Sequence, residues 1–137
     1  MIILDTTIIL ETQQKQPDPN VIVFLDQLDP TTTYTTAITV TEIMRGISLL
    51  PPGRYKRELE NSAGTLFRQT FAGRILSFNF EAAQHLAIDA APDEHPSLAV
   101  SFAERVVAGI AKSNNGAIVA THNVSQFEVM GTPVVNP

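Results

Sequence analysis

The sequence contains no cysteine, and this absence excludes disulfide bonds and thiolate metal sites. It also lacks an uninterrupted apolar run near the roughly 20 residues that a membrane-spanning helix requires. The apolar N-terminal stretch is interrupted at Asp5 and has no basic segment before it, unlike a secretion signal. These absences lead us to expect a cytoplasmic protein that does not associate with membranes.

Basic residues are also few in this chain. Lysine and arginine total 9 against 14 aspartates and glutamates, and the net charge of -5 argues against broad binding of polyanions. A nuclease is still compatible with this charge, because carboxylates that hold divalent cations count as negative until the metal binds. Five basic residues cluster in one segment, which is either a solvated helix face, the simpler interpretation, or an RNA-facing edge. They are Arg54, Lys56, Arg57, Arg68 and Arg74.

Short apolar strands alternate with helical patterns along the chain. The first apolar run predicts a buried strand that ends at Asp5. Strands separated by helices predict a three-layer α/β/α sandwich with a central, mainly parallel sheet, formed by a single domain over residues 1–137. The other predicted strands are residues 31–38, 74–78, 117–120 and 134–135, the predicted helices are residues 8–11, 19–28, 39–50, 59–70, 81–90 and 101–113, and residues 91–96 are a predicted loop.

Several polar residues follow the predicted strands directly. In open α/β sheets, ligands bind in the crevice beyond the carboxyl ends of the strands. Asp5 follows the first strand, Glu42 the second and Asn123 the fourth, and Glu104 lies in the first turns of the helix before that strand. Converging carboxylates are the oxygen ligands that a hard cation such as Mg²⁺ binds, and water bound to it becomes a nucleophile.

Helix capping is an alternative role for some of these residues. Residues 39–42 and 101–104 both match the capping box, so each of their glutamates has a structural explanation. Asn123 also matches an N-cap. Asp5 has no such local explanation, because an unpaired carboxylate at the end of a buried strand is costly, and a cation or a helix N-terminus should be its partner. The three histidines lack the spacing of a transition-metal site.

Four collinear blocks carry a family resemblance that spans the chain. They are Met1–Thr7, Thr36–Gly46, Val107–Ala111, and Ala120–Asn123 with Phe127 and Val134–Pro137. In this order they resemble the successive motifs of PIN domains, most closely the VapC and FitB branch of toxins. The resemblance implies a metal-dependent endoribonuclease with a central parallel sheet. It also implies a homodimer and inhibition by a cognate antitoxin whose tail covers the acidic crevice.

The resemblance assigns roles to four residues. Asp5 matches the first family aspartate, Glu42 the family glutamate, Glu104 the third acid and Asn123 the fourth position, which is aspartate or asparagine. On this interpretation Asp5, Glu42 and Glu104 bind Mg²⁺ or Mn²⁺, and Asn123 orients a ligand or water. The predicted catalytic set is therefore Asp5, Glu42, Glu104 and Asn123, and the predicted substrate is RNA.

Three positions depart from the family pattern. Thr7 stands where the family usually has asparagine, Glu104 replaces an aspartate, and Asn79 occupies a position that is often acidic. The segment 91–98 is also acidic where such toxins tend to be basic. A glutamate reaches one methylene further than an aspartate, so metal ligation by Glu104 requires an adjustment of rotamer or backbone. An alternative hypothesis is therefore a PIN-fold protein with weakened or lost catalysis that acts as an antitoxin-binding module.

Overall fold

The sheet at the centre of the molecule has five strands in the order β3-β2-β1-β4-β5, and every neighbouring pair is parallel. The computed structural model describes residues 1–88 and 98–137. The strands are β1 (Ile2–Leu4), β2 (Thr33–Thr36), β3 (Ile75–Leu76), β4 (Ile118–Ala120) and β5 (Val134–Val135). The order runs outward in opposite directions from β1 and β4, so the topological switch point lies between their carboxyl ends.

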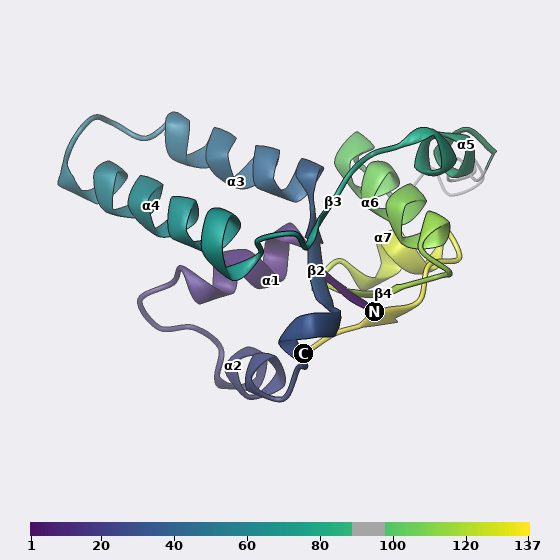
Figure 1. Ribbon diagram of the computed structural model, residues 1–137, viewed down its shortest axis with the longest axis horizontal. Coiled ribbons are helices and arrows are strands. Elements are labelled where there is room, and N and C mark those ends of the chain that lie inside the picture. Colours follow the sequence, from purple (N-terminus) through teal and green to yellow (C-terminus); the bar gives the residue numbers. More distant parts are fainter. Residues whose placement is uncertain (89–97) are drawn as a thin grey trace.

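Helices cover both faces of this sheet and complete the three layers (Figure 1). One side carries α1 (Thr6–Thr12), α2 (Pro19–Asp26), α3 (Ala37–Ser48) and α4 (Arg54–Thr65), which continues as a π-helical turn over Leu66–Thr70. The other side carries α5 (Phe80–Ile88), α6 (Phe102–Ser113) and α7 (Val124–Glu128). A 3₁₀ turn, Pro30–Thr32, leads into β2. The predicted α/β/α sandwich with a parallel sheet is therefore confirmed.

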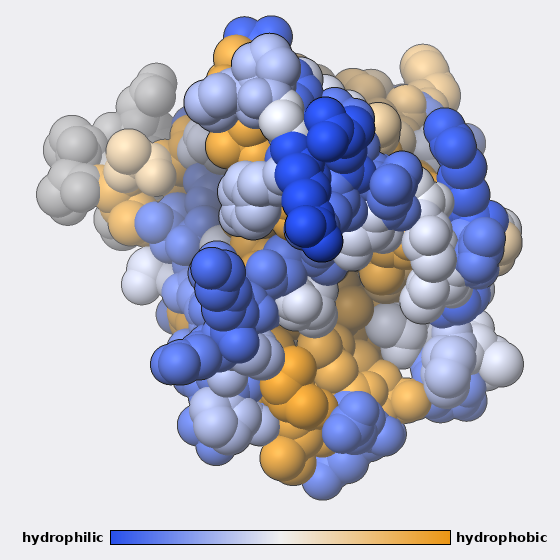
Figure 2. Space-filling model, turned by 90° about the vertical axis from the view of Figure 1, so that its left-hand side faces the viewer, coloured by the Kyte–Doolittle hydropathy of each residue, from blue (hydrophilic) through white to orange (hydrophobic). Residues whose placement is uncertain are grey.

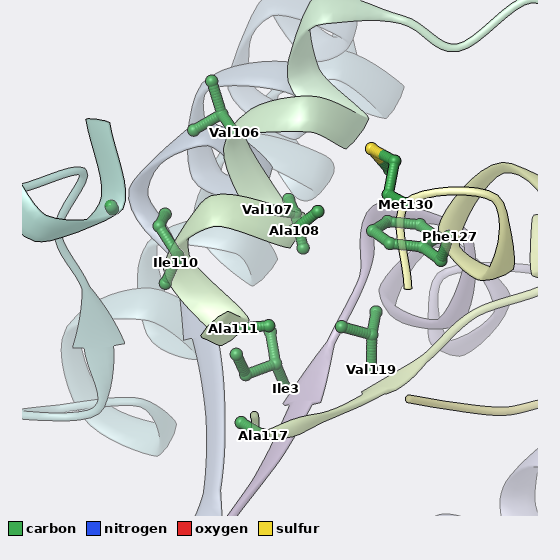
Figure 3. Close-up of a cluster of buried hydrophobic side chains, with 11 residues drawn as sticks. Ile3, Val106, Val107, Ala108, Ile110, Ala111, Ala117, Val119, Phe127 and Met130 are labelled. Carbon is green, nitrogen blue, oxygen red and sulfur yellow. The ribbon is translucent and has the colours of Figure 1, made fainter. Parts of the chain in front are cut away.

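Alternate residues of each strand supply two separate cores. Ile3 and Val119 pack with α6 and with Phe127 of α7 on one face (Figure 3). Leu4 and Ala120 pack on the opposite face with residues of α1 to α4. Each fully buried aliphatic side chain contributes about 1.5–3 kcal/mol to folding. Because both faces of β1 and β4 are buried at their carboxyl ends, a polar residue directly after either strand lies at the edge of the hydrophobic interior.

The helix starts predicted near Pro19 and Ser101 agree with the structure, whereas the helices predicted from residues 8, 39 and 59 begin earlier, at Thr6, Ala37 and Arg54. Asp18 accepts a hydrogen bond from Asn20 N at 2.8 Å before Pro19, and Ser101 forms the predicted capping box with Glu104. The helix predicted from residue 39 instead begins at Ala37, because Thr36 is its N-cap and accepts from Thr39 N at 3.2 Å. The second strand therefore ends earlier than predicted, since β-branched residues favour a strand until a hydroxyl cap ends it.

Helices α5 and α6 approach closely where Gly109 faces α5. A Cβ atom at Gly109 would lie 2.6 Å from the carbonyl oxygen of Ala82. Only a residue without a side chain therefore fits this crossing. The predicted helix 81–90 is described up to Ile88, and the predicted loop 91–96 and most of the acidic segment 91–98 lie outside the described residues.

The basic segment makes several structural contacts. Lys56 Nζ donates to the carbonyl oxygens of Ser48 and Leu50 at the end of α3, at 3.0 and 3.3 Å. Arg54 pairs with Glu58 at 2.8 Å, and the guanidinium of Arg74 donates to three carbonyl oxygens. The exposed pair of Arg54 and Glu58 agrees with the simpler interpretation, a solvated helix face, and the RNA-facing edge stays an untested alternative. Figure 2 shows the side of the molecule that lies on the left in Figure 1. Hydrophilic side chains dominate the upper part of this side, and hydrophobic ones gather lower down, where α2 lies.

Candidate active site

Asp5 lies at the topological switch point, one residue beyond the end of β1. Its backbone N–H donates to Ala120 O at 3.1 Å, which places it beside the end of β4. The side chain is only 4% exposed, and its Oδ2 accepts a hydrogen bond from Thr121 Oγ1 at 2.8 Å. Thr7 Oγ1 donates to the same oxygen at 3.4 Å. The sequence prediction that the first strand ends in a carboxylate at the crevice agrees with this placement.

The electrostatic environment of Asp5 is unfavourable for a lone anion. Burial raises the pKa of the Asp5 carboxyl, whereas hydrogen bonds from Thr121 and from the Thr6 backbone lower it. The negative charges of Glu42 and Glu104 raise this pKa further. The hydrogen-bond donors identified around the carboxylate are neutral, and its charged neighbours are of the same sign, so a bound cation would favour its ionised form.

Glu42 lies on α3, near enough to Asp5 for its charge to raise the pKa of that carboxyl. It lies in the second turn of this helix, and Thr6 Oγ1, in the first turn of α1, donates to its Oε2. The capping alternative for Glu42 is wrong, because α3 begins at Ala37 and Glu42 is too far along the helix to reach the first turn. The side chain is exposed and available to a ligand on the surface of the crevice.

Glu104 forms the capping box that the sequence allowed, and it also contacts Asn123. Its Oε2 accepts from Ser101 N at 2.7 Å, and Ser101 Oγ accepts from Glu104 N at 3.1 Å, which completes the capping box. Its Oε1 accepts from Asn123 Nδ2 at 3.0 Å. Asn123 occupies the N-cap position of α7, as predicted, but its side chain makes no capping hydrogen bond there. The structure thus brings Glu104 and Asn123 together, with both glutamate oxygens already engaged in hydrogen bonds.

Two threonine hydroxyls link these acids: that of Thr121, to which the sequence assigned no role, and that of Thr7, which it marked only as a departure from the family pattern. Thr121 is fully buried, donates to Asp5 and accepts from Asn123 N at 2.9 Å. Thr7 Oγ1 accepts from His122 N at 3.0 Å and lies 3.4 Å from Thr121 Oγ1. A signal for Thr121 was present, because it follows an apolar strand just as Asp5 does. Asn79, by contrast, caps α5 through a 3.0 Å bond from Ala82 N.

The donor chemistry of the crevice suits a hydrated hard cation. In residues 1–88 and 98–137, no three or more His, Cys, Asp or Glu side chains converge as a ready-made metal cage. Mg²⁺ does not need such a cage, because it keeps several waters and uses one or two carboxylates. Asp5, Glu42 and Glu104 provide oxygen donors of this type, and a cation bound there would relieve the charge repulsion at Asp5.

Comparisons with known proteins cover the whole chain. No protein-family model matches it. It is 36% identical to the plasmid stability protein StbB of Pseudomonas syringae pv. tomato, over 100% of this chain and 98% of that protein. It is 31% identical to the VapC ribonuclease Y4jK of Sinorhizobium fredii, over 100% and 97% of the two chains. It is 33% identical to the toxin FitB of Neisseria gonorrhoeae, over 100% of this chain and 98% of that protein.

Solved structures give the same picture. FitAB bound to an IR36 DNA fragment contains a chain with a TM-score of 0.90 and 33% identity, which covers 100% of this chain and 95% of that one. A chain of VapBC2 from Rickettsia felis, bound to a DNA fragment from its promoter, matches with a TM-score of 0.76 and 21% identity. The match covers 100% of this chain and 99% of that one. The second likeness concerns the fold alone.

Proposed function

The chain belongs to the VapC and FitB family of PIN-domain toxins, and from this membership we propose that it is a metal-dependent endoribonuclease, the toxin of a toxin-antitoxin pair. Its substrate is RNA, and its cofactor is Mg²⁺ or Mn²⁺. The relatives that are named a VapC ribonuclease and the toxin FitB support this assignment over the full length of the chain.

The observation that carries the proposal is the buried carboxylate of Asp5 at the switch point. Glu42 and Glu104 are close enough that their charges raise the pKa of Asp5. Burying an anion next to like charges is costly, and a fold keeps such a cluster when a cation compensates for it. Carboxylates that gather at this edge of a parallel sheet are well placed to act on a ligand in the crevice.

The residues around Asp5 have distinct parts in the proposed reaction. Asp5, Glu42 and Glu104 would hold the ion directly or through water. A bound divalent ion supplies a Lewis acid that activates water and stabilises negative charge on phosphate. Thr121 keeps the Asp5 carboxylate in place through its 2.8 Å hydrogen bond. Asn123, which donates to Glu104, helps orient a ligand or water.

An apolar groove next to the crevice supports an antitoxin as partner. It runs between α1, α3 and α4, and Glu42 lies among its lining residues. A peptide in this groove would reach the acidic crevice at Glu42, which fits an antitoxin tail that inhibits the enzyme. The groove is lined mainly by Ile9, Leu10, Ile43, Ile47, Leu59 and Leu66. The expected homodimer stays a prediction, which light scattering of the purified protein tests.

The test combines metal titration with RNA cleavage. Wild-type protein should bind Mg²⁺ or Mn²⁺ in calorimetry and cleave total RNA only when a divalent ion is present. Asp5→Asn should abolish both metal binding and RNA cleavage, because it removes the charge of the central carboxylate while the side chain keeps its size. Asp26→Asn, at the exposed end of α2, is the matched control and should leave both unchanged. Cleavage that survives both EDTA and Asp5→Asn contradicts the proposal.

A second candidate function rests on the engaged side chain of Glu104. Both of its oxygens accept hydrogen bonds from the protein, from Ser101 N and Asn123 Nδ2. A carboxylate held in this way binds metal weakly, and such a protein would act as an antitoxin-binding module with reduced catalysis. Glu104→Asp distinguishes the two functions: a large gain in metal affinity and cleavage supports the binding module, and wild-type activity equal to that of the variant rejects it.

A further inference from the structure

His122 follows the end of β4, between two residues that contact the acids. Thr121 before it donates to Asp5, and Asn123 after it donates to Glu104. Its own backbone N–H donates to Thr7 Oγ1 at 3.0 Å. The main chain of His122 is therefore held in a defined position next to the carboxylates, and its side chain is exposed.

The imidazole ring of His122 is also oriented by the chain. Its Nδ1 lies 2.8 Å from Asn136 Oδ1, and an amide oxygen can only accept, so Nδ1 carries a hydrogen. Asn136 directly follows β5, whose Val135 O accepts from Thr121 N at 3.0 Å. The residue that holds the ring is thus tied to the same edge of the sheet as Asp5. Among the described residues, Nε2 has no hydrogen-bond partner and remains available to a ligand.

An acidic crevice repels a polyanionic substrate unless donors on its rim bind the phosphates. With its hydrogen on Nδ1, the neutral ring can only accept at Nε2, whereas the protonated ring also donates from Nε2 to a phosphate oxygen in a charge-assisted hydrogen bond, and the negative charge of the phosphate favours that protonated form. We infer that His122, oriented by Asn136, binds an RNA phosphate adjacent to the one that is cleaved. This inference rests on the proposed ribonuclease function, and it makes His122 a substrate-binding residue and Asn136 a positioning residue.

RNA binding by non-cleaving protein tests this inference separately from catalysis. In the Asp5→Asn background, the affinity for a labelled single-stranded oligoribonucleotide is measured by fluorescence anisotropy at several salt concentrations. His122→Ala should weaken binding about tenfold, because a hydrogen bond to a charged group is lost. It should also make the dependence of log affinity on log salt shallower by about 0.7, as expected for one lost phosphate contact on a single strand.

Further variants distinguish the phosphate contact from other roles. Asn136→Ala should weaken RNA binding less than His122→Ala does. Asn136→Asp should bind RNA with the affinity of the protein that retains Asn136, because a carboxylate also accepts a hydrogen bond from Nδ1 of His122. Lys15→Ala removes an exposed basic residue from the connection between α1 and α2 and should leave the affinity within about twofold.

Several results would overturn the inference. They are an unchanged affinity in His122→Ala, a loss of affinity without a change in the salt dependence, and full affinity in His122→Phe, which would indicate base stacking instead. Failure of the ribonuclease proposal is read separately, from the absence of cleavage by wild-type protein.

Discussion

Two buried threonines provide a direct test of how the site is held together. The hydroxyl of Thr121 donates to Asp5 at 2.8 Å and accepts from Asn123 N at 2.9 Å, and the residue is 0% exposed. Thr132 is 3% exposed, and its hydroxyl has no hydrogen-bond partner among the described residues. Valine has nearly the same shape as threonine, so replacing either threonine by valine removes little more than the hydroxyl. The free energies of unfolding of the two variants should therefore differ only by the contribution of the Thr121 hydrogen bonds.

The expected magnitudes follow from those contacts. Thr121→Val loses a hydrogen bond to a charged group, about 1.5–3 kcal/mol, and leaves Asn123 N without its acceptor, about 1 kcal/mol more. We expect a loss of about 2.5–4 kcal/mol in the free energy of unfolding. Thr132→Val should be neutral or stabilising by up to about 1 kcal/mol, because it removes a buried polar group that is already unpaired.

Urea denaturation at neutral pH without divalent ions measures both variants against the wild type. Equal m-values would show that the unfolding transitions are comparable. Equal destabilisation by the two substitutions would refute the reasoning, because it would mean that the Thr121 hydroxyl contributes nothing through Asp5 and Asn123. A stabilised Thr121→Val protein would refute it as well.

Two other predictions concern packing and pH. Gly109→Ala should lower the free energy of unfolding by about 1–3 kcal/mol, because its Cβ would lie 2.6 Å from Ala82 O. A Cβ at Gly64 in α4 would have nothing within 4 Å, so Gly64→Ala should raise the free energy of unfolding by up to about 1 kcal/mol. Thermal melts that rank the two variants the other way contradict this prediction. The raised pKa of Asp5 means that the folded state binds more protons than the unfolded state, so metal-free protein should lose stability as the pH rises above the ordinary aspartate range and through the folded pKa. Asp5→Asn should remove this part of the pH dependence in chemical denaturation series, and an unchanged slope would argue against it.

Local patterns were predictable from the sequence, and contacts between distant segments were not. The apolar run before Asp5 and the capping box from Ser101 to Glu104 involve neighbours in the chain, so their residue types predict their structure. The hydrogen bond from Thr121 to Asp5 joins residues 116 positions apart, and it depends on β1 pairing with β4. No spacing in the sequence indicates that pairing directly.

The start of α3 shows how tertiary contacts override propensity. The threonine-rich segment before it favours a longer strand, because β-branched residues fit a sheet. Thr35 Oγ1 donates to Leu4 O at 3.0 Å, while Thr36 caps the helix, so the hydroxyl groups rather than the branched carbons determine where the strand ends. That early start moves Glu42 out of the capping position and leaves its carboxylate free to face the crevice.

The two outer strands of the sheet limit how other chains can join it. β3 and β5 are each two residues long, so each free edge presents very few unpaired backbone groups. An edge this short gives an incoming strand almost nothing to pair with, which protects the sheet from edge-to-edge aggregation. We therefore expect an antitoxin or a second copy of this chain to associate through side chains on the helices, where individual substitutions can retune recognition without disturbing the sheet.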